Sequence, residues 1–328
     1  MPHLKPMGGA LARLGEFERP YAGRRRKRQG AGRVPRIDTG SPAGYPPPMQ
    51  EGQFSRTALG AAGRRAAHQV VEGGRVFADP LALRILGADA DAAVAEARAN
   101  PALRGLRLYV AVRSRFAEDA ARRAIGRGVR QIVVLGAGLD TFAYRVEPSE
   151  GLRVYEVDHP STQAEKRRRL VAAGIAAAAH VVYVGCDFES ESLAGALAAS
   201  GFDAGRPSFF LWLGVVPYLT EPAIFATLAF IGKLPGGGEV VFDYANPAAT
   251  IADQGWRRGH EIVAARAAAA GEPLRTSFVT TALHEKLREL GFRSIEDLGP
   301  DQIAARFAPE RAASSGENGG HLMLAGTL

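Results

Sequence analysis

The chain has 328 residues, 46% of them hydrophobic, which is enough to bury the core of one large α/β domain with an appended segment. Its formal net charge of +7 comes from residues 1–50, which carry 10 Lys+Arg against 3 Asp+Glu, while the rest carries 31 of each. A folded domain of balanced charge lacks the positive surface that phosphate-backbone binding requires, so no nucleic-acid partner is expected.

The single cysteine, Cys186, excludes an intramolecular disulfide and a cysteine zinc cluster, and we predict no metal site. No stretch approaches the roughly 20 continuous apolar residues of a membrane span, and the N-terminus lacks the apolar segment of a secretory signal. We therefore predict a soluble, cytoplasmic protein without a membrane partner. The sequence carries no signal for an oligomeric state.

Residues 1–50 form a basic, proline-rich segment with the run Arg24 to Arg28 and the triplet Pro46 to Pro48. Such a composition cannot bury enough apolar surface to offset the entropy of ordering, so this segment is predicted to be a disordered tail. A basic run can tether a protein or direct its localisation, but a solvated tail is the favoured interpretation. Met49 directly precedes the first patterned segment, which suggests that the working protein starts there.

A helical subdomain is predicted over residues 51–126. Residues 55–111 are rich in Ala, Leu and Arg at helical spacing, with breaks near Gly73-Gly74 and Asp79-Pro80. An amphipathic helix that ends near Gly126 follows from apolar residues at intervals of four: Val112, Phe116, Ala120 and Ala124.

The remaining residues, 127–328, alternate between short apolar runs and helical stretches. The runs are 131–135, 152–157, 181–184, 208–213, 239–242, 293–298 and 321–325. Consecutive apolar residues are typical of strands covered on both faces, so we predict a doubly wound, mostly parallel seven-stranded sheet of Rossmann-like α/β class. The last two runs, separated by a loop-like stretch, can pair as an antiparallel hairpin. An Ala-rich helix within 246–276 is the predicted lid.

Gly136-Ala137-Gly138 ends the first strand and is predicted to lead into a helix. Glycines let the backbone turn sharply and approach a ligand closely, and a helix N-terminus offers free N–H groups. The dinucleotide motif requires a third glycine where this chain has Thr141, so a nucleoside cofactor without a pyrophosphate is favoured. A plain tight turn between strand and helix is the alternative.

Carboxylates follow the next two strands. Asp158 ends the second strand, nearer the ligand-binding edge than Glu156, and is predicted to accept hydrogen bonds from a ribose. Asp187 and Phe188 follow the third strand, where a carboxylate for an exocyclic amine and an apolar face suit adenine. The alternatives are a helix N-cap before Pro160 and an ordinary loop acid.

Residues 135–145 and 155–160 together resemble the signature of the leucine carboxyl methyltransferase family, most closely its bacterial S-adenosylmethionine-dependent members. The similarity runs from about Ser55 to the C-terminus. Further blocks are Phe77–Pro80, Leu211–Val215 with Tyr218–Thr220, Gly271–Pro273 and Gly319–His321. The resemblance implies a class I methyltransferase fold, an enzyme, and S-adenosylmethionine as its cofactor.

The resemblance also implies roles for single residues. Gly136 and Gly138 would line the cofactor, Asp158 would hold the ribose, and Asp187 with Phe188 would frame the adenine. Arg113 matches the family arginine that pairs with the cofactor's carboxylate, a task suited to a planar bidentate donor. Arg65 is predicted as a second basic residue near that carboxylate, with an exposed helix face as the alternative.

Two departures from the family pattern limit which family properties can be expected of this chain. Leu213 stands where the eukaryotic enzymes tend to have a glutamate, which removes one cofactor contact. Residues 246–276 are the least similar, so the protein C-terminus on which those relatives act is not carried over. We expect a small-molecule acceptor instead.

Methyl transfer from a sulfonium is an in-line displacement that depends mostly on positioning, and a carboxylate acceptor needs no general base. For a hydroxyl acceptor, Tyr218 and His159 are candidate catalytic residues, and Asp243, Tyr244 and His260 are weaker ones. A nicotinamide-dependent oxidoreductase, disfavoured by Thr141, and a non-catalytic cofactor-binding protein are the alternatives. Lys166 to Arg169 are expected on an exposed helix face.

Overall fold

The computed structural model describes residues 54–252, 254–307 and 319–327. All of them belong to one compact unit, Pro48–Leu328. The predicted tail over residues 1–50 lies outside the described residues, and so does Met49. In the described part of the chain, no helix has the length and apolarity to cross a bilayer.

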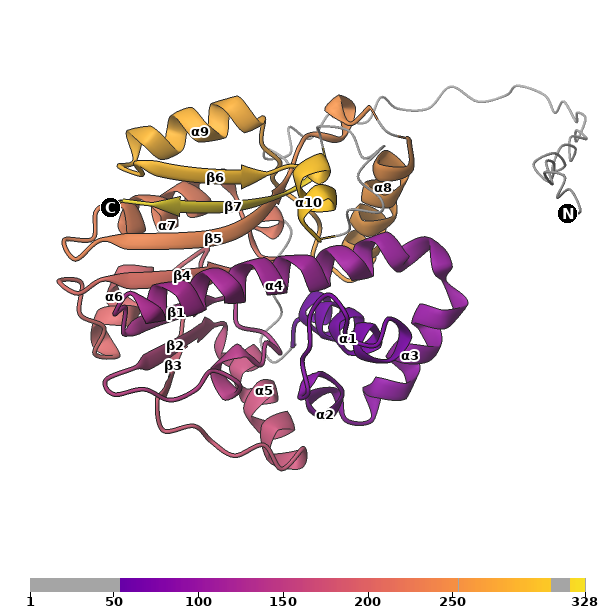
Figure 1. The fold of residues 1–328 in the computed structure, drawn as a ribbon, viewed down its shortest axis with the longest axis horizontal. Coiled ribbons are helices and arrows are strands. Elements are labelled where there is room, and N and C mark those ends of the chain that lie inside the picture. Colours follow the sequence, from indigo (N-terminus) through magenta and orange to yellow (C-terminus); the bar gives the residue numbers. More distant parts are fainter. Residues whose placement is uncertain (1–53, 253, 308–318, 328) are drawn as a thin grey trace, which may run out of the picture. The chain divides into compact units, whose positions relative to one another are not determined.

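A seven-stranded sheet in the order β3-β2-β1-β4-β5-β7-β6 forms the centre of the molecule (Figure 1). The first five strands in this order are parallel, and β7 is antiparallel to both of its neighbours. The predicted doubly wound, mostly parallel sheet is thereby confirmed, including the terminal antiparallel pair. The strands are β1 Gln131–Leu135, β2 Arg153–Asp158, β3 Val181–Gly185, β4 Ser208–Trp212, β5 Gly238–Ala245, β6 Ser294–Leu298 and β7 Gly320–Gly326.

Helices cover both faces of the sheet, as the continuous apolar runs predict. In β4, Phe209 and Leu211 face one core and Phe210 and Trp212 face the other. The first core is closed by α4 (Arg104–Gly126) with support from α10 (Pro300–Phe307). The second is closed by α6 (Leu193–Ala199), α7 (Glu221–Gly232) and α9 (Thr280–Glu289). Burial of this apolar surface on both faces is the main stabilising contribution to the fold.

The N-terminal helices gather at the edge to which the parallel strands point, together with α8 (Figure 1). These N-terminal helices are α1 Arg56–Val71, α2 Ala82–Leu86 and α3 Asp89–Ala99, and α8 is Gln254–Ala269. The helix that follows β2 is α5, Pro160–Ala172. A third, small core joins α1 and α2 to Leu139 of the glycine turn and Leu170 of α5. This core places the first helix beside the turn that follows β1.

Three local predictions were wrong. The glycine turn leads not into an α-helix but into a 3₁₀ turn, Phe142–Tyr144, since the stretch up to β2 contains Pro148 and Gly151. The stretch predicted as a loop before β7 contains α10, whose Ile303 and Phe307 pack on the α4 side of the sheet. Lys166 is not on an exposed face, because it is buried at 1% exposure.

Candidate functional site

The turn after β1 requires glycine at two positions. Gly136 has φ 64° and Gly138 has φ 43°, both in the left-handed region that residues with a Cβ rarely adopt. A Cβ on Gly136 would collide with Val215 Cγ2, and a Cβ on Gly138 would lie 3.2 Å from Ala58 Cβ of α1. Val215, in the loop after β4, and Ala58, in the first turn of α1, thus lie against this turn, which we call the glycine cradle.

Asp158 lies against this turn. Its Oδ2 accepts the Gly138 N–H at 2.5 Å and its Oδ1 accepts the His159 N–H at 2.7 Å. Burial raises the pKa of Asp158, although these two hydrogen bonds act in the opposite direction. A carboxylate has about four lone-pair positions, so the Asp158 side chain keeps capacity for two more donors.

The neighbouring carboxylate, Glu156, is already paired. Its Oε1 accepts a bond from Lys166 Nζ at 2.7 Å, and both side chains are almost fully buried. The helix after β2 is capped by His159, whose Nδ1 lies 3.3 Å from the Ser161 N. Asp158 is thus not the N-cap of that helix, and His159, a candidate catalytic residue, has a local structural role.

Backbone bonds align the ends of β1, β2 and β3. Ala137 N donates to Val157 O at 3.1 Å, and Cys186 N donates to Asp158 O at 3.0 Å. Asp187 therefore follows β3 at the same edge as Asp158. Its carboxylate accepts the Glu189 N–H and the Ser190 hydroxyl, while the half-buried Phe188 packs against the core beneath α6 and α7.

Arg113 on α4 reaches the ends of β4 and β5. Its Nη1 lies 2.8 Å from Asp243 Oδ2, and Asp243 Oδ1 accepts the Gly214 N–H at 2.5 Å. Gly214 has φ 68°, and a Cβ there would lie 2.5 Å from Arg113 Nη2. Asp243, a weak candidate for orienting the acceptor, therefore holds the guanidinium of Arg113 in place.

Arg65 is bound to the two residues that directly follow the glycine turn, Leu139 and Asp140. Its guanidinium pairs with Asp79 at 2.8 Å and Asp140 at 3.0 Å and donates to Leu139 O at 2.6 Å. The side chain is 6% exposed, so an exposed helix face does not describe it either. These contacts argue against Arg65 as a ligand of the cofactor's carboxylate.

Its neighbour Arg64 is placed quite differently. The Arg64 guanidinium folds back toward the start of α1, since a Cβ on Gly60 would lie 3.0 Å from its Nη1. Burial lowers the pKa of Arg64, and the charges of Arg266 and Arg113 lower it further. Within the described residues, no carboxylate is bonded to Arg64. A half-buried guanidinium without a bonded carboxylate is a group that attracts an anion.

Tyr218 lies between these charges, in the 3₁₀ turn Val216–Tyr218 after β4. Burial raises its pKa, while Arg113 is the largest influence that lowers it. Over the ranges that the structure describes, the Tyr218 hydroxyl has no hydrogen-bond partner. By contrast, the Tyr244 hydroxyl donates to Asp297 at 2.6 Å, and His260 lies on α8.

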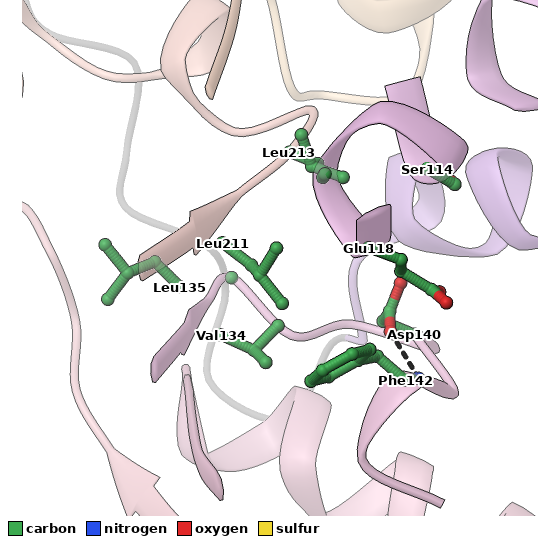
Figure 2. A pocket seen from close by; sticks show the side chains of 10 residues that line it. Ser114, Glu118, Val134, Leu135, Asp140, Phe142, Leu211 and Leu213 are labelled. Atoms are coloured by element: carbon green, nitrogen blue, oxygen red, sulfur yellow. Dashed lines mark hydrogen bonds between the residues drawn. The ribbon is translucent and has the colours of Figure 1, made fainter. Parts of the chain in front are cut away.

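A cavity of about 30 Å³ lies under the glycine turn, between α4 and the ends of β1 and β4 (Figure 2). Leu211 and Leu213 line one side, and Glu118 and Asp140 line the other. Its volume is enough for about one water molecule, which is far too small for a nucleoside. Leu213, a predicted departure from the family pattern, thus borders this small cavity with an apolar side chain.

The comparison with family models decides the family. The leucine carboxyl methyltransferase model matches residues 58–232, more than half of the chain. The chain belongs to the leucine carboxyl methyltransferase family. The matched residues include the glycine turn, Asp158, Asp187, Arg113 and Tyr218.

Similar curated proteins carry methyltransferase names. A Bacillus subtilis protein named "Putative S-adenosyl-L-methionine-dependent methyltransferase YktD" is 33% identical over 201 residues, which cover 61% of this chain and 66% of that protein. A similarly named Saccharopolyspora erythraea protein is 41% identical over 130 residues, covering 40% of this chain and 45% of that protein. The matched region thus spans less than two thirds of each relative.

Solved structures agree on the fold. A DUF574 family protein from Streptomyces avermitilis has a TM-score of 0.51 at 22% identity, covering 80% of this chain and 95% of that one. A structure from Thermobifida fusca described as "a putative methyltransferase" also has a TM-score of 0.51, at 16% identity, covering 80% of this chain and 93% of that one. The chain therefore shares its doubly wound, Rossmann-like fold with these two structures.

Two residues beside the groups of the site, Arg64 and Glu272, are not predicted from the sequence. Arg64 and the predicted Arg65 are neighbours in the same Ala-rich helix, so their residue type alone does not separate them. Glu272 belongs to the block Gly271–Pro273, and its carboxylate accepts bonds from the start of α1. The available signal for Glu272 is its place in the block Gly271–Pro273, through which the sequence resembles the family.

Proposed function

We propose that this protein transfers a methyl group from S-adenosylmethionine to an oxygen atom of a small acceptor molecule. The observation that carries the proposal is the glycine cradle joined to Asp158 through the 2.5 Å bond from the Gly138 N–H. It combines close backbone approach with a carboxylate that has capacity for two hydroxyl donors. These features fit a nucleoside cofactor.

The other groups of the site suit the rest of the cofactor. Asp187 and Phe188, at the end of the adjacent strand, would take the adenine amine and its ring face. Arg113 and Arg64 would take the carboxylate of the methionine part, for which Arg64 replaces the predicted Arg65. Held this way, the bound cofactor supplies an electrophilic methyl group on a sulfonium.

An oxygen acceptor is supported by the charges around Tyr218. The guanidinium groups of Arg113 and Arg64 favour an anionic oxygen nearby and disfavour a protonated amine. The carboxylates of Asp243 and Glu272 act in the opposite direction. Because burial raises the pKa of Tyr218, its hydroxyl stays protonated at neutral pH and can donate a hydrogen bond to the acceptor. The acceptor oxygen forms the new bond to the methyl carbon as the carbon–sulfur bond breaks, and the thioether leaves as a neutral group.

The small size of the acceptor is supported by what surrounds Tyr218. The first turn of α1 and residues 272–276 lie around the site, and Arg275 N donates to Pro217 O at 2.7 Å. Exclusion of water by such segments protects the reacting groups and fixes their approach, which is most of the work in a displacement.

A binding and transfer experiment tests the proposal. Calorimetric titration should give binding of S-adenosylhomocysteine and none of NAD; binding of NAD alone would reverse the assignment. With methyl-labelled cofactor and a panel of carboxylic acids, phenols and amines, the label should enter an oxygen acceptor. Mild base then separates the classes, because methyl esters release labelled methanol and aryl methyl ethers do not. Label found only on amines would contradict an oxygen acceptor.

A further inference from the structure

One carboxylate joins two segments that lie far apart in the sequence. Glu272 follows α8, and its Oε1 accepts the backbone N–H groups of Arg56 at 2.8 Å and Thr57 at 3.3 Å. Its Oε2 accepts the Ser55 hydroxyl at 2.8 Å and the Thr57 hydroxyl. The first turn of α1 is thus fastened by a residue more than 200 positions further along the chain.

These bonds do more than cap a helix. Ser55 already caps α1 from within, because its Oγ accepts the Ala58 N–H at 3.0 Å. Glu272 adds charge-assisted bonds to donors that the helix itself cannot satisfy, and a negative charge at a helix N-terminus is favourable. The bonds to Glu272 therefore add to the local cap and hold the first turn of α1 against the segment that follows α8.

What the fastened turn covers is the cofactor cradle. Ala58, the next residue along α1, is the closest neighbour of Gly138, whose N–H bonds to Asp158. Gly138 is buried, and a Cβ placed on it would lie 3.2 Å from Ala58 Cβ of α1. The residues that Glu272 holds, Ser55 to Thr57, directly precede Ala58.

The other end of the connection is the acceptor side of the site. The segment of Glu272 is bound to the turn around Tyr218 through Arg275 N to Pro217 O and through Thr276 Oγ1 to Leu219 O at 2.6 Å. Glu272 is also among the charges that act on Tyr218. Glu272 thus connects the helix over the cofactor cradle to the turn that presents the acceptor.

We propose that Glu272 is a positioning residue that keeps α1 closed over the cofactor and so sets how fast the cofactor enters and leaves. The inference rests on the proposed function, since it assigns Glu272 to the cofactor site. It touches no reacting atom and acts through α1. Loss of this single carboxylate leaves four hydrogen-bond donors without their acceptor at once. We call the four bonds from residues 55–57 to Glu272 the latch.

Stopped-flow fluorescence on the full chain tests the latch. S-adenosylhomocysteine is the probe, and the variants are Glu272→Ala, Glu272→Gln and Thr57→Val, which removes one hydroxyl donor from the helix side. We expect Glu272→Ala to raise the dissociation rate about tenfold or more, the loss of one to two charge-assisted hydrogen bonds. Glu272→Gln and Thr57→Val should show smaller increases, with KM for the cofactor raised more than kcat is lowered.

The controls separate the possible failures. Glu289→Gln removes an exposed carboxylate that pairs with Lys286 inside α9, and it should dissociate the probe at the wild-type rate. A purely structural Glu272 would lower the melting temperature and leave dissociation unchanged, which would overturn the latch. If Glu272→Ala fails to fold, the other two variants decide. Absence of probe binding to the wild-type chain would instead refute the proposed function.

Discussion

Replacing Asp158 by Asn tests the centre of the cofactor site. The ionised carboxylate accepts two backbone N–H bonds, from Gly138 and His159, and has room for two ribose hydroxyls. A hydrogen bond to a charged group contributes about 1.5–3 kcal/mol. Asn keeps one acceptor oxygen and loses the charge, so we expect S-adenosylhomocysteine to bind more weakly by about that amount, which is about 10- to 150-fold in Kd.

The substitution also acts on the turn itself. The amide NH₂ of Asn must face one of the two backbone N–H groups, and a buried N–H without an acceptor costs about 1–3 kcal/mol. Calorimetric titration at neutral pH therefore needs a thermal melt beside it, so that lost binding is compared with lost stability. Asp119→Asn, on the exposed side of α4, serves as control. A folded Asp158→Asn protein with wild-type affinity would remove Asp158 from the site.

Three further predictions use paired variants or pH. Arg65→Met should lower the free energy of unfolding by about 1–3 kcal/mol, because Asp79 and Asp140 each lose a buried charged partner while Arg145 still pairs with Asp79. Arg64→Met should instead leave urea unfolding unchanged and weaken S-adenosylhomocysteine binding about tenfold. Gly136→Ala should destabilise by about 1–3 kcal/mol more than Gly151→Ala, which meets the same left-handed backbone in open space. Burial raises the pKa of Asp158, and its ionised form accepts hydroxyl donors more strongly than its protonated form. Affinity should therefore fall as pH drops through that raised pKa, and Asp158→Asn should flatten this profile in calorimetry.

The fold was readable because its strands are buried on both faces. Runs such as Ile132 to Leu135 and Phe209 to Trp212 are short and apolar at consecutive positions, a pattern typical of a strand covered on both faces. The 3₁₀ turn at Phe142–Tyr144 was missed for a physical reason as well. The segment is held by charges that are distant in sequence, with Arg145 Nη1 donating to Glu118 at 2.9 Å, so its local pattern carried little information.

The choice between Arg64 and Arg65 shows where reasoning from sequence stops. Adjacent residues on an α-helix point about 100° apart, so only one of them can face a given site. The phase of a helix is read from its apolar stripe, but α1 buries mostly Ala and Gly, with His68 and Arg65 among them. A stripe of small residues interrupted by buried polar ones does not fix the phase. Arg65 is instead recognised as the buried arginine by its ion pairs with Asp79 and Asp140. The tertiary fold brings these two carboxylates close to Arg65.

The predicted site residues therefore divide by the kind of reasoning behind them. Gly136, Gly138, Asp158 and Asp187 follow strands of one parallel sheet, and topology alone brings the ends of such strands to one edge. Arg65 was chosen by chemical type, and an arginine has many possible partners within reach of its long side chain. The pairing of Glu272 with the start of α1 adds a third case, because neither strand order nor residue type brings residues 55–57 and 272 together. Mutations at strand ends test the sheet topology, whereas mutations at Arg64 and Glu272 test contacts that only the folded chain creates.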